Sequence, residues 1–239
     1  MTGPWALTLL FPKPQSTGRT RKWGWLSALI CSAVLAGCAQ LQPVQLPEET
    51  TPPPSDSALW TSISVRESDD WHLLLDNGPN ALNWRLTAID SATESIDLQT
   101  FLWLWDDVGR QVMRHVLAAA DRGVFIRLLV DDSFLLGDDQ RSLALDEHPN
   151  IEYRIYNPYR ERPSRALGRE LLNLNEFHRV DHRMHNKAMV IDNRVAIVGG
   201  RNLADEYFGL HPEANFRDLE LLVGGPIVQD VSAEFDRYW

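Results

Sequence analysis

The 239-residue chain contains few cysteines, few basic residues and no long apolar run. Its two cysteines, Cys31 and Cys38, both lie in the first 38 residues, and we expect no disulfide. There are 23 Lys and Arg against 33 Asp and Glu, a net charge of −10, and the acidic excess lies after residue 38. Such a body repels polyphosphate, so no nucleic-acid partner is expected. A hydrophobic content of 44% nevertheless suits one folded domain.

The longest apolar stretch near the start, residues 23–35, follows three basic residues and is too short to span a bilayer. Its length is typical of a signal-peptide core. The run ends in Leu-Ala-Gly-Cys38, which resembles the lipobox of bacterial lipoproteins. That resemblance implies a signal peptide at residues 1–37 and a lipidated Cys38; the alternative is an ordinary signal peptide followed by a chance cysteine. Ala39 favours the outer membrane, facing the periplasm, as the location.

Residues 38–70 are rich in Pro, Gln, Glu, Thr and Ser and cannot bury enough apolar surface to fold. We expect them to tether a folded domain at residues 71–239 to the membrane. Apolar spacing in that domain predicts helices alternating with short strands, and hence an α/β sandwich with a mixed, mostly parallel sheet. The expected helices are 81–92 (capped by Asn80), 107–122, 166–177 and 227–239, and the expected strands are 95–105, 124–132, 151–158, two in 186–200 and 217–225.

The chemistry-bearing residues gather in "RMHNKAMVIDNRVAIVGGRN", residues 183–202. Alternate residues of a strand point to one side, so His185 and Lys187 should project together. Phosphate or carboxylate chemistry suits this pair, because the ammonium attracts an anion that the imidazole can attack or protonate. Gly199 and Gly200 allow close approach of the backbone to a ligand. Asn202 is placed where the next helix should start, either as an anion-binding residue or only as a helix cap.

The spacing His185-x-Lys187-x4-Asp192-x6-Gly199-Gly200-x-Asn202 resembles the signature of the phospholipase D superfamily. Further local matches point to its cardiolipin-synthase-like branch: "ALNWRLTAIDSA", "IYNPYRER" and "GGRNLADEYFG". The resemblance covers about residues 73–239 and implies the phospholipase D-like α-β-α sandwich.

The same resemblance implies roles for single residues. His185 would be the nucleophile that forms a phosphohistidine, and Lys187, Gly200 and Asn202 would hold phosphate oxygens. Asp192 belongs to the catalytic motif by resemblance, but its position after an apolar strand favours a structural ion pair or a turn. Asp218 would hydrogen-bond His185 and fix its tautomer. Gly200 departs from the family, which often has Ser there and so one more hydroxyl donor.

The signature occurs once, whereas the family builds its site from two such motifs. The remaining histidines are not followed by Lys two residues later. We therefore expect a second half, in a region beyond Trp239 or in a second copy of the chain.

The resemblance implies phosphatidyl transfer, with cardiolipin as product, a phospholipid substrate, and neither cofactor nor metal. The alternatives are hydrolysis of phospholipid or nucleic-acid phosphodiesters, or a non-catalytic lipoprotein that binds anionic headgroups.

Three neighbouring patterns have less specific interpretations. His178, His182 and His185 could form a metal site only if they shared a helix. An arginine series either meets lipid phosphates or is simply solvated: Arg160, Arg162, Arg165 and Arg169. The acidic strand end at residues 130–132 is expected to be structural.

Overall fold

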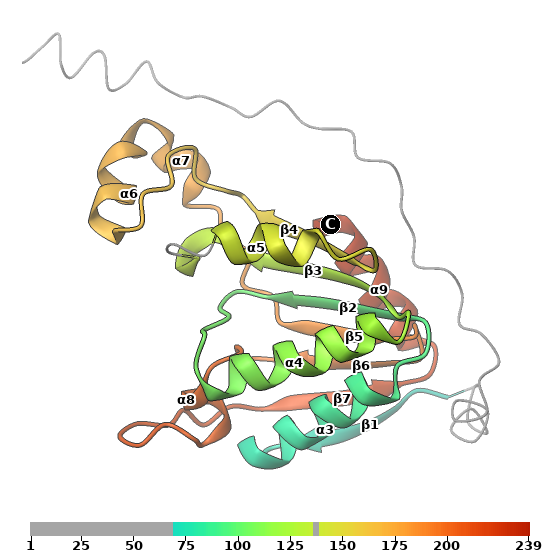
Figure 1. Ribbon diagram of the computed structural model, residues 1–239. Helices are drawn as coiled ribbons and strands as arrows, with labels where there is room; N and C mark the ends of the chain where they lie inside the picture. The colour runs from blue at the N-terminus through green and yellow to red at the C-terminus, as the bar shows by residue number, and fades with distance from the viewer. Residues whose placement is uncertain (1–68, 136–138) are drawn as a thin grey trace, which may run out of the picture.

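A computed structural model describes residues 69–135 and 139–239. Its centre is one seven-stranded sheet with strand order β1-β7-β6-β5-β2-β3-β4 (Figure 1). The strands are β1 (Trp71–Leu75), β2 (Ser95–Thr100), β3 (Phe125–Asp131), β4 (Ile151–Tyr156), β5 (Ala188–Ile191), β6 (Val195–Gly199) and β7 (Glu220–Gly224).

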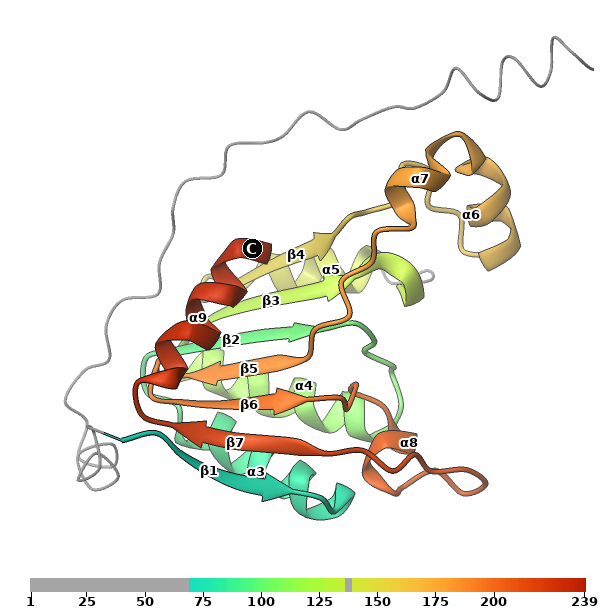
Figure 2. The same cartoon turned by 180° about the vertical axis from the view of Figure 1, so that it is seen from behind.

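Helices cover both faces of this sheet. One face carries α3 (Gly78–Ser91), α4 (Asp107–Asp121) and α5 (Asp139–Asp146), and α9 (Ile227–Tyr238) crosses the other (Figures 1 and 2). The connections hold η2 (Asp132–Phe134), α6 (Ala166–Leu172), η3 (Leu174–Glu176), α7 (Phe177–Val180) and α8 (Asp205–Phe208). The predicted α/β sandwich with a mixed sheet is confirmed.

The expectation of a mostly parallel sheet is wrong. Only the β2–β3 and β3–β4 pairings are parallel, and the four pairings from β1 to β2 through β7, β6 and β5 are antiparallel. The reason is that helical crossovers between adjacent strands occur only in the first half, where α4 joins β2 to β3 and α5 joins β3 to β4, whereas a short turn joins β5 to β6. Asp192 and Asn193 both have positive φ, 49° and 51°, which suits the tight β5–β6 hairpin that the sequence predicts at this dipeptide.

Strand β2 lies inside the sheet, between β5 and β3, and ends earlier than expected. All six of its residues are buried, including Asp97, which pairs with Arg127 of β3 at 2.6 Å. The expected continuation to residue 105 does not form, because β5, its antiparallel neighbour, begins only at Ala188, opposite Gln99. The chain therefore leaves the sheet at Phe101, and this departure opens the edge where the predicted site residues lie.

Several helix and strand ends differ from the sequence prediction. Helix α3 is capped by Asn77, whose side chain accepts a hydrogen bond from the backbone N–H of Asn80, the residue expected to be the cap. Helix α4 ends just before Gly123, which has a φ of 97° and acts as the expected stop. Strand β1 was not predicted, because it is an edge strand whose central residues are exposed.

The proposed signal peptide, residues 1–37, and the proposed lipidation site, Cys38, lie outside the described residues, as does the tether up to residue 68. Within residues 69–135 and 139–239, the helices are too short or too polar to cross a bilayer.

Candidate functional site

The predicted nucleophile and cation meet at the edge where β2 ends and β5 begins. Neither lies in a strand, since β5 starts at Ala188, yet both contact the ring of Phe101. The His185 ring centroid is 4.8 Å from that of Phe101, and Nζ of Lys187 is 5.2 Å from it. Nζ of Lys187 also donates a hydrogen bond of 2.7 Å to the carbonyl oxygen of His185. Phe101 thus packs against both side chains. The sequence did not predict this contact, because the apolar residues around Phe101 continue past the end of β2.

The two side chains differ in exposure, and this sets their protonation. His185 is exposed, whereas Lys187 is only 6% exposed. Desolvation and then the positive charge of Lys187 lower the pKa of His185 below its usual 6.5, with Asp131 acting in the opposite direction. Desolvation lowers the pKa of Lys187 to about 8, against the charges of Asp218 and Asp131, which raise it. Near pH 7 the site therefore holds a neutral imidazole beside an ammonium.

Asp131, at the end of β3, fixes the segment that leads into His185. Its carboxylate is fully buried and accepts hydrogen bonds from the backbone N–H of Met184 at 3.0 Å and from Ser133. It also forms an ion pair with Arg183 at 3.2 Å. The acidic strand end therefore has a structural role, and it positions the residue directly before the imidazole.

Gly199 and Gly200 lie beside Lys187. The N–H of Gly199 donates to the carbonyl oxygen of Lys187 at 3.3 Å, and a Cβ at position 199 would lie 2.5 Å from the carbonyl oxygen of Leu219. A Cβ at position 200 would lie 2.3 Å from Oδ1 of Asp218. Position 199 therefore needs glycine, because the close atoms include backbone, whereas a side chain at position 200 would displace the Asp218 carboxylate.

Arg201, the variable residue of the Gly-Gly-x-Asn sequence, fixes this loop to its neighbours through buried hydrogen bonds. It is 2% exposed and donates hydrogen bonds to the carbonyl oxygens of Leu75, Asp76, Tyr207 and Asp218. Its guanidinium also lies 3.6 Å from Glu220 of β7.

Glu220 is itself buried and pairs with a second cation, Arg85 of α3, at 2.6 Å. The sequence analysis missed this Arg85–Glu220–Arg201 cluster. Its members are 135 and 19 residues apart, and no local pattern connects them.

Asn202 lies beside the residues that follow β2. Its Oδ1 accepts a hydrogen bond of 3.1 Å from the backbone N–H of Leu102, which orients the amide next to Phe101. Helix α8 begins only at Asp205 and has Ala204 at its N-cap, so Asn202 is not a helix cap. Within the part of the chain that the structure describes, Nδ2 of Asn202 has no hydrogen-bond partner, and it remains available for an anion.

Asp192 is placed away from this edge, at the far end of β5. Its carboxylate accepts hydrogen bonds from the backbone N–H groups of Thr93, Glu94 and Ser95 and from the Thr93 hydroxyl, at 2.8 to 3.2 Å. The structure therefore gives Asp192 a structural role, joining the β5–β6 turn to the start of β2, and does not bring it to His185 or Lys187.

Asp218 does not make the expected hydrogen bond to His185. Its Oδ1 accepts from the backbone N–H of Leu219 at 2.7 Å, and its carboxylate packs against Gly200. Among the described residues, neither ring nitrogen of His185 has a hydrogen-bond partner. Because its charge acts on Lys187, Asp218 stabilises the ammonium here and leaves the imidazole unrestrained.

The arginine series and the nearby histidines divide into structural and exposed groups. Arg162 pairs with Asp132 and Asp139, and buried Arg169 pairs with Asp132, whereas Arg160 and Arg165 are exposed. His178 and His182 contact each other with ring centroids 5.3 Å apart, on α7 and just after it. His185 belongs to the extended segment before β5, so the three histidines do not share a helix.

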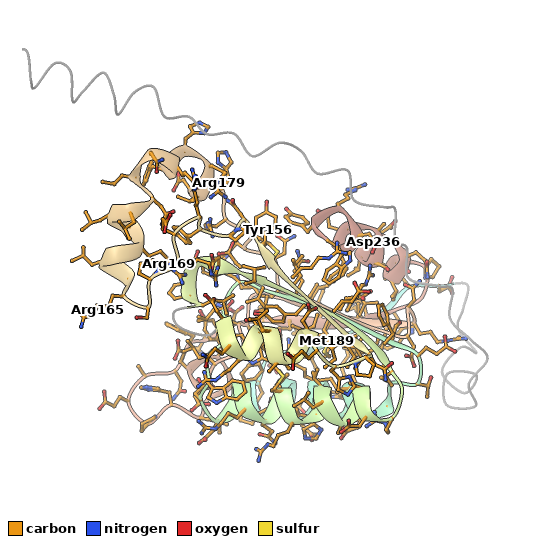
Figure 3. All side chains as sticks on the ribbon, turned by 45° about the horizontal axis from the view of Figure 1, so that its top comes forward. Tyr156, Arg165, Arg169, Arg179, Met189 and Asp236 are labelled. Atoms are coloured by element: carbon orange, nitrogen blue, oxygen red, sulfur yellow. The ribbon has the colours of Figure 1, made fainter. Side chains whose placement is uncertain are left out.

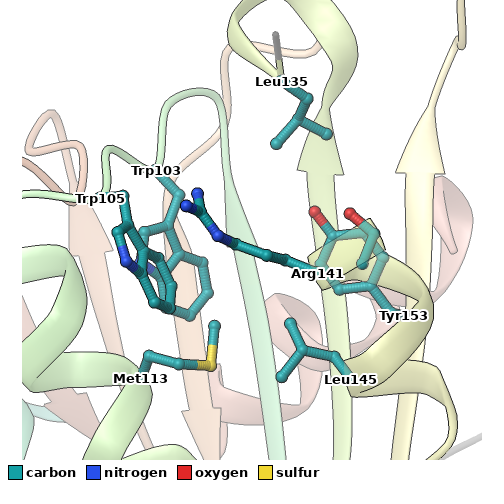
Figure 4. Close-up of a pocket in the computed structure, with 8 residues that line it drawn as sticks. Trp103, Trp105, Met113, Leu135, Arg141, Leu145 and Tyr153 are labelled. Carbon is teal, nitrogen blue, oxygen red and sulfur yellow. The ribbon is translucent and has the colours of Figure 1, made fainter. Parts of the chain in front are cut away.

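Two hollows lie near these elements. A groove of about 400 Å³ lies between the β5–β6 end of the sheet and α9, and it is lined by Lys187 and Gly199 on one side and by Asp230 and Glu234 on the other. A smaller pocket of about 40 Å³ lies on the opposite face of the sheet between α4 and α5 (Figure 4). Arg141 lies 4.8 Å from the ring centroid of Trp105 in that pocket, which contains none of the motif residues.

Comparison with known proteins shows the family to which the chain belongs. Residues 86–239 match the family described as "Cardiolipin synthase, PLD-like domain". Cardiolipin synthase C of Escherichia coli K12 is 41% identical over 165 residues, covering 69% of this chain and 34% of that protein. Cardiolipin synthase B of the same strain is 38% identical over 165 residues, covering 66% and 36%. The chain thus matches about a third of the length of these relatives.

Solved structures share the fold at low sequence identity. NucT from Helicobacter pylori superposes with a TM-score of 0.53 at 16% identity, covering 71% of this chain and 96% of that one. Phosphatidylserine synthase of Haemophilus influenzae Rd KW20 gives a TM-score of 0.51 at 12% identity, covering 70% and 36%.

Proposed function

Because the chain belongs to the phospholipase D-like family of the cardiolipin synthases, we propose that it contributes one half of the active site of a phosphatidyltransferase. The observation that carries this proposal is the pairing of His185 and Lys187 on Phe101, beside two glycines and the free amide donor of Asn202. A neutral imidazole next to a desolvated cation suits nucleophilic attack on a phosphodiester.

In the first step, the unprotonated ring nitrogen of His185 attacks the phosphorus of a phospholipid. A bond from nitrogen to phosphorus forms, the bond from phosphorus to the headgroup alcohol oxygen breaks, and that alcohol leaves with a proton from a general acid. Lys187 and Asn202 neutralise and orient the non-bridging oxygens as negative charge builds on them. Because Lys187 is held by the carbonyl oxygen of His185, the cation is in place before substrate arrives.

In the second step, the hydroxyl of an acceptor alcohol attacks the phosphohistidine. The new bond from phosphorus to oxygen replaces the bond to nitrogen, and the acceptor proton goes to the general base that donated in the first step. When the acceptor is the glycerol headgroup of phosphatidylglycerol, the product is cardiolipin. When the acceptor is water, the outcome is hydrolysis.

The general acid and base would come from a second motif. The described residues supply one His-x-Lys pair, and the matched relatives are about three times as long as the aligned segment. We propose that the partner motif lies beyond Trp239 in the full-length protein, or in a second copy of the chain. A lipidated Cys38 at the periplasmic face of the outer membrane would hold the domain near its phospholipid substrate.

The test is turnover by the full-length protein with His185→Ala, and His72→Ala as the control. His72 is an exposed histidine on β1, at the far edge of the sheet, so its loss should leave activity unchanged. The substrate is phosphatidylglycerol in vesicles, the products scored are cardiolipin and phosphatidic acid, and an oligonucleotide is assayed in parallel. We expect His185→Ala to abolish cardiolipin formation and to remove an acid-labile phosphatidyl adduct.

Three results would count against the proposal. Wild-type turnover in His185→Ala would favour a binding role. Phosphatidic acid as the sole product would mean hydrolysis, and cleavage of the oligonucleotide alone would mean a phosphodiesterase acting on nucleic acid.

A further inference from the structure

The segment between β4 and β5 exposes large apolar side chains. We call residues 159–183, which include α6, η3 and α7, the α6–α7 excursion; it projects from one end of the sheet (Figures 1 and 2). Five of its apolar side chains are 58 to 73% exposed: Leu167, Leu171, Leu172, Leu174 and Phe177. An apolar cluster of this kind marks an interaction site more often than a free surface.

The excursion buries its polar residues instead. Arg169, Asn173 and Glu176 are 2, 2 and 5% exposed. Arg169 donates hydrogen bonds to the carbonyl oxygens of Asp132 and Leu135, at 2.7 and 2.8 Å. This is the reverse of the usual distribution, in which charged residues are outside and leucines are inside.

Further polar contacts join residues within the excursion to one another. Asn173 exchanges hydrogen bonds with the backbone of Glu161 at 3.0 and 2.8 Å, and Glu176 pairs with Arg179. These bonds set which face of α6 turns inward. Figure 3 shows Arg169 on the side of α6 toward the sheet and Arg165 at its outer end. The leucines are therefore exposed by a defined scaffold and not by loose packing.

The excursion is joined rigidly to the candidate site. Asn157 Nδ2 donates to the carbonyl oxygens of Arg179 and His182, both at 2.8 Å, and Arg183 donates back to the carbonyl oxygen of Asn157 at 2.9 Å. From Arg183 the chain reaches His185 in two residues. The apolar surface therefore has a set position relative to the backbone that leads into His185.

A second apolar projection lies at the same end of the sheet. The loop between α8 and β7 exposes Leu210, Phe216 and Leu219 by 48, 57 and 58%. It extends in the same direction as the α6–α7 excursion (Figures 1 and 2). The edge that holds His185 thus has apolar side chains on both sides.

The charge of the excursion differs from that of the rest of the chain. It contains six Arg and four Asp or Glu, and its Arg162, Arg169 and Arg183 pair with acids outside it, Asp131, Asp132 and Asp139. Arg160 and Arg165 are exposed, and within the described ranges neither has a recorded ion-pair partner. Cations at the margin of exposed leucines suit a surface that is apolar inside and anionic at its boundary.

We infer that the α6–α7 excursion docks onto the surface of an anionic phospholipid bilayer and presents headgroups to His185. The inference rests on the proposed function, which requires a membrane-resident substrate at this edge. The leucines enter the boundary between headgroups and acyl chains, and Arg160 and Arg165 contact lipid phosphates. A protein partner would satisfy the leucines equally well, but exposed Arg160 and Arg165 beside them, together with the membrane-resident substrate of the proposed function, favour the bilayer.

The test uses a fluorescent reporter in the full chain, in a Cys31→Ser/Cys38→Ser background. An environment-sensitive probe is attached at Leu171→Cys, or at Leu74→Cys on β1 as the control. Leu74 is a similarly exposed leucine, 51% against 58%, on the opposite edge strand. Vesicles contain phosphatidylglycerol with acyl-brominated lipid, and the two labelled proteins differ only in the position of the probe.

We expect strong quenching and a blue shift at position 171 and little change at position 74. The same contrast should persist in the His185→Ala background, so docking and catalysis can fail separately. A probe at position 171 that stays in water on vesicles would overturn the inference. So would a probe that is already shielded without lipid in a chain sedimenting as a dimer, because the apolar surface would then be an interface between copies.

A functional arm uses Leu167→Ser/Leu171→Ser, with Leu74→Ser/Leu143→Ser as the matched control. All four leucines are more than half exposed, so neither pair should unfold the domain. In the full-length protein, the first pair should lower turnover of vesicle phosphatidylglycerol by about tenfold or more, because about two side-chain burials are lost. Turnover of monomeric short-chain phosphatidylglycerol should be unchanged. Equal losses on both substrates would contradict docking.

Discussion

The ammonium of Lys187 is hydrogen-bonded to the main-chain carbonyl oxygen of His185, its proposed catalytic partner, at 2.7 Å. The nucleophile and the cation are therefore held by the same short stretch of backbone, and their separation does not depend on flexible side chains alone. Because desolvation lowers the pKa of Lys187 to about 8, this arrangement has a direct consequence for pH dependence.

We predict a bell-shaped pH profile of kcat/KM for the full-length protein. The rate should rise as His185 loses its proton, with a midpoint below the usual 6.5, because the pKa of His185 is lowered. It should fall near pH 8 as Lys187 becomes neutral. Lys187→Arg should remove this alkaline fall, because Arg stays protonated, although it should also lower the rate. A wild-type rate that stays constant well above pH 8 would contradict the assignment.

Asp192→Asn should destabilise the fold without entering the chemistry. The carboxylate accepts from three consecutive backbone N–H groups, and an amide would turn a donor toward some of them. We expect a loss of about 2–4 kcal/mol in the free energy of unfolding, measured by urea titration. The control, Asp121→Asn, removes an exposed carboxylate paired with His148 and should change stability by less than about 0.5 kcal/mol. If the folded variant kept full stability but lost all turnover, a chemical role would be indicated.

Glu220→Gln should be among the most destabilising single changes. It leaves the buried guanidinium groups of Arg85 and Arg201 without their shared anion, at a cost of about 3–5 kcal/mol. The matched control is Glu152→Gln, whose partner Arg154 lies at 3.8 Å on the surface. Chemical unfolding measures both variants, and equal stabilities would show that the buried cluster makes no net contribution.

Gly200→Ser tests whether a side chain at position 200 displaces the Asp218 carboxylate. The added Cβ would push away the Asp218 carboxylate, which raises the pKa of Lys187. We expect the alkaline limb of the pH profile to move to lower pH, with a stability loss of about 1 kcal/mol. In an Asp218→Ala background, Gly200→Ser should cost no further stability. Additive losses in that double-mutant cycle would contradict a direct clash.

The sequence predicted those elements whose local signals agree with their packing. The β5–β6 hairpin followed from two apolar runs around Asp192 and Asn193, and α4 followed from its apolar stripe and Gly123. Strand β1 could not be recognised, because an edge strand exposes Leu73 and Leu74 and shows no clear alternation. The antiparallel pairing of most strands was not predicted. The pairing of β5 with β2, for example, joins residues about 90 positions apart, and no local sequence pattern indicates it.

Part of the candidate site was also predictable from local sequence signals. His185, Lys187 and the glycines lie within one short segment whose spacing indicates phosphate chemistry. The role of Phe101 was not predicted, because apolar residues continue beyond Thr100 and give no sign that β2 ends there. Strand β2 ends where its neighbour β5 begins, at Ala188 opposite Gln99. The position of Asp218 depends on packing against Gly200, so its expected bond to the imidazole could not be checked from spacing.

The bonds of Asp192 to the start of β2 also determine which side chains reach the opposite end of β5. Strand β5 has only four residues, and the pleat inverts every side chain when a strand slips by one. A one-residue slip would put Asn186 or Ala188 in the place of Lys187, depending on its direction, and would remove the ammonium from this edge. Under the proposed function, Asp192 would thus act at a distance from the reaction, by fixing the strand register that places Lys187 beside His185.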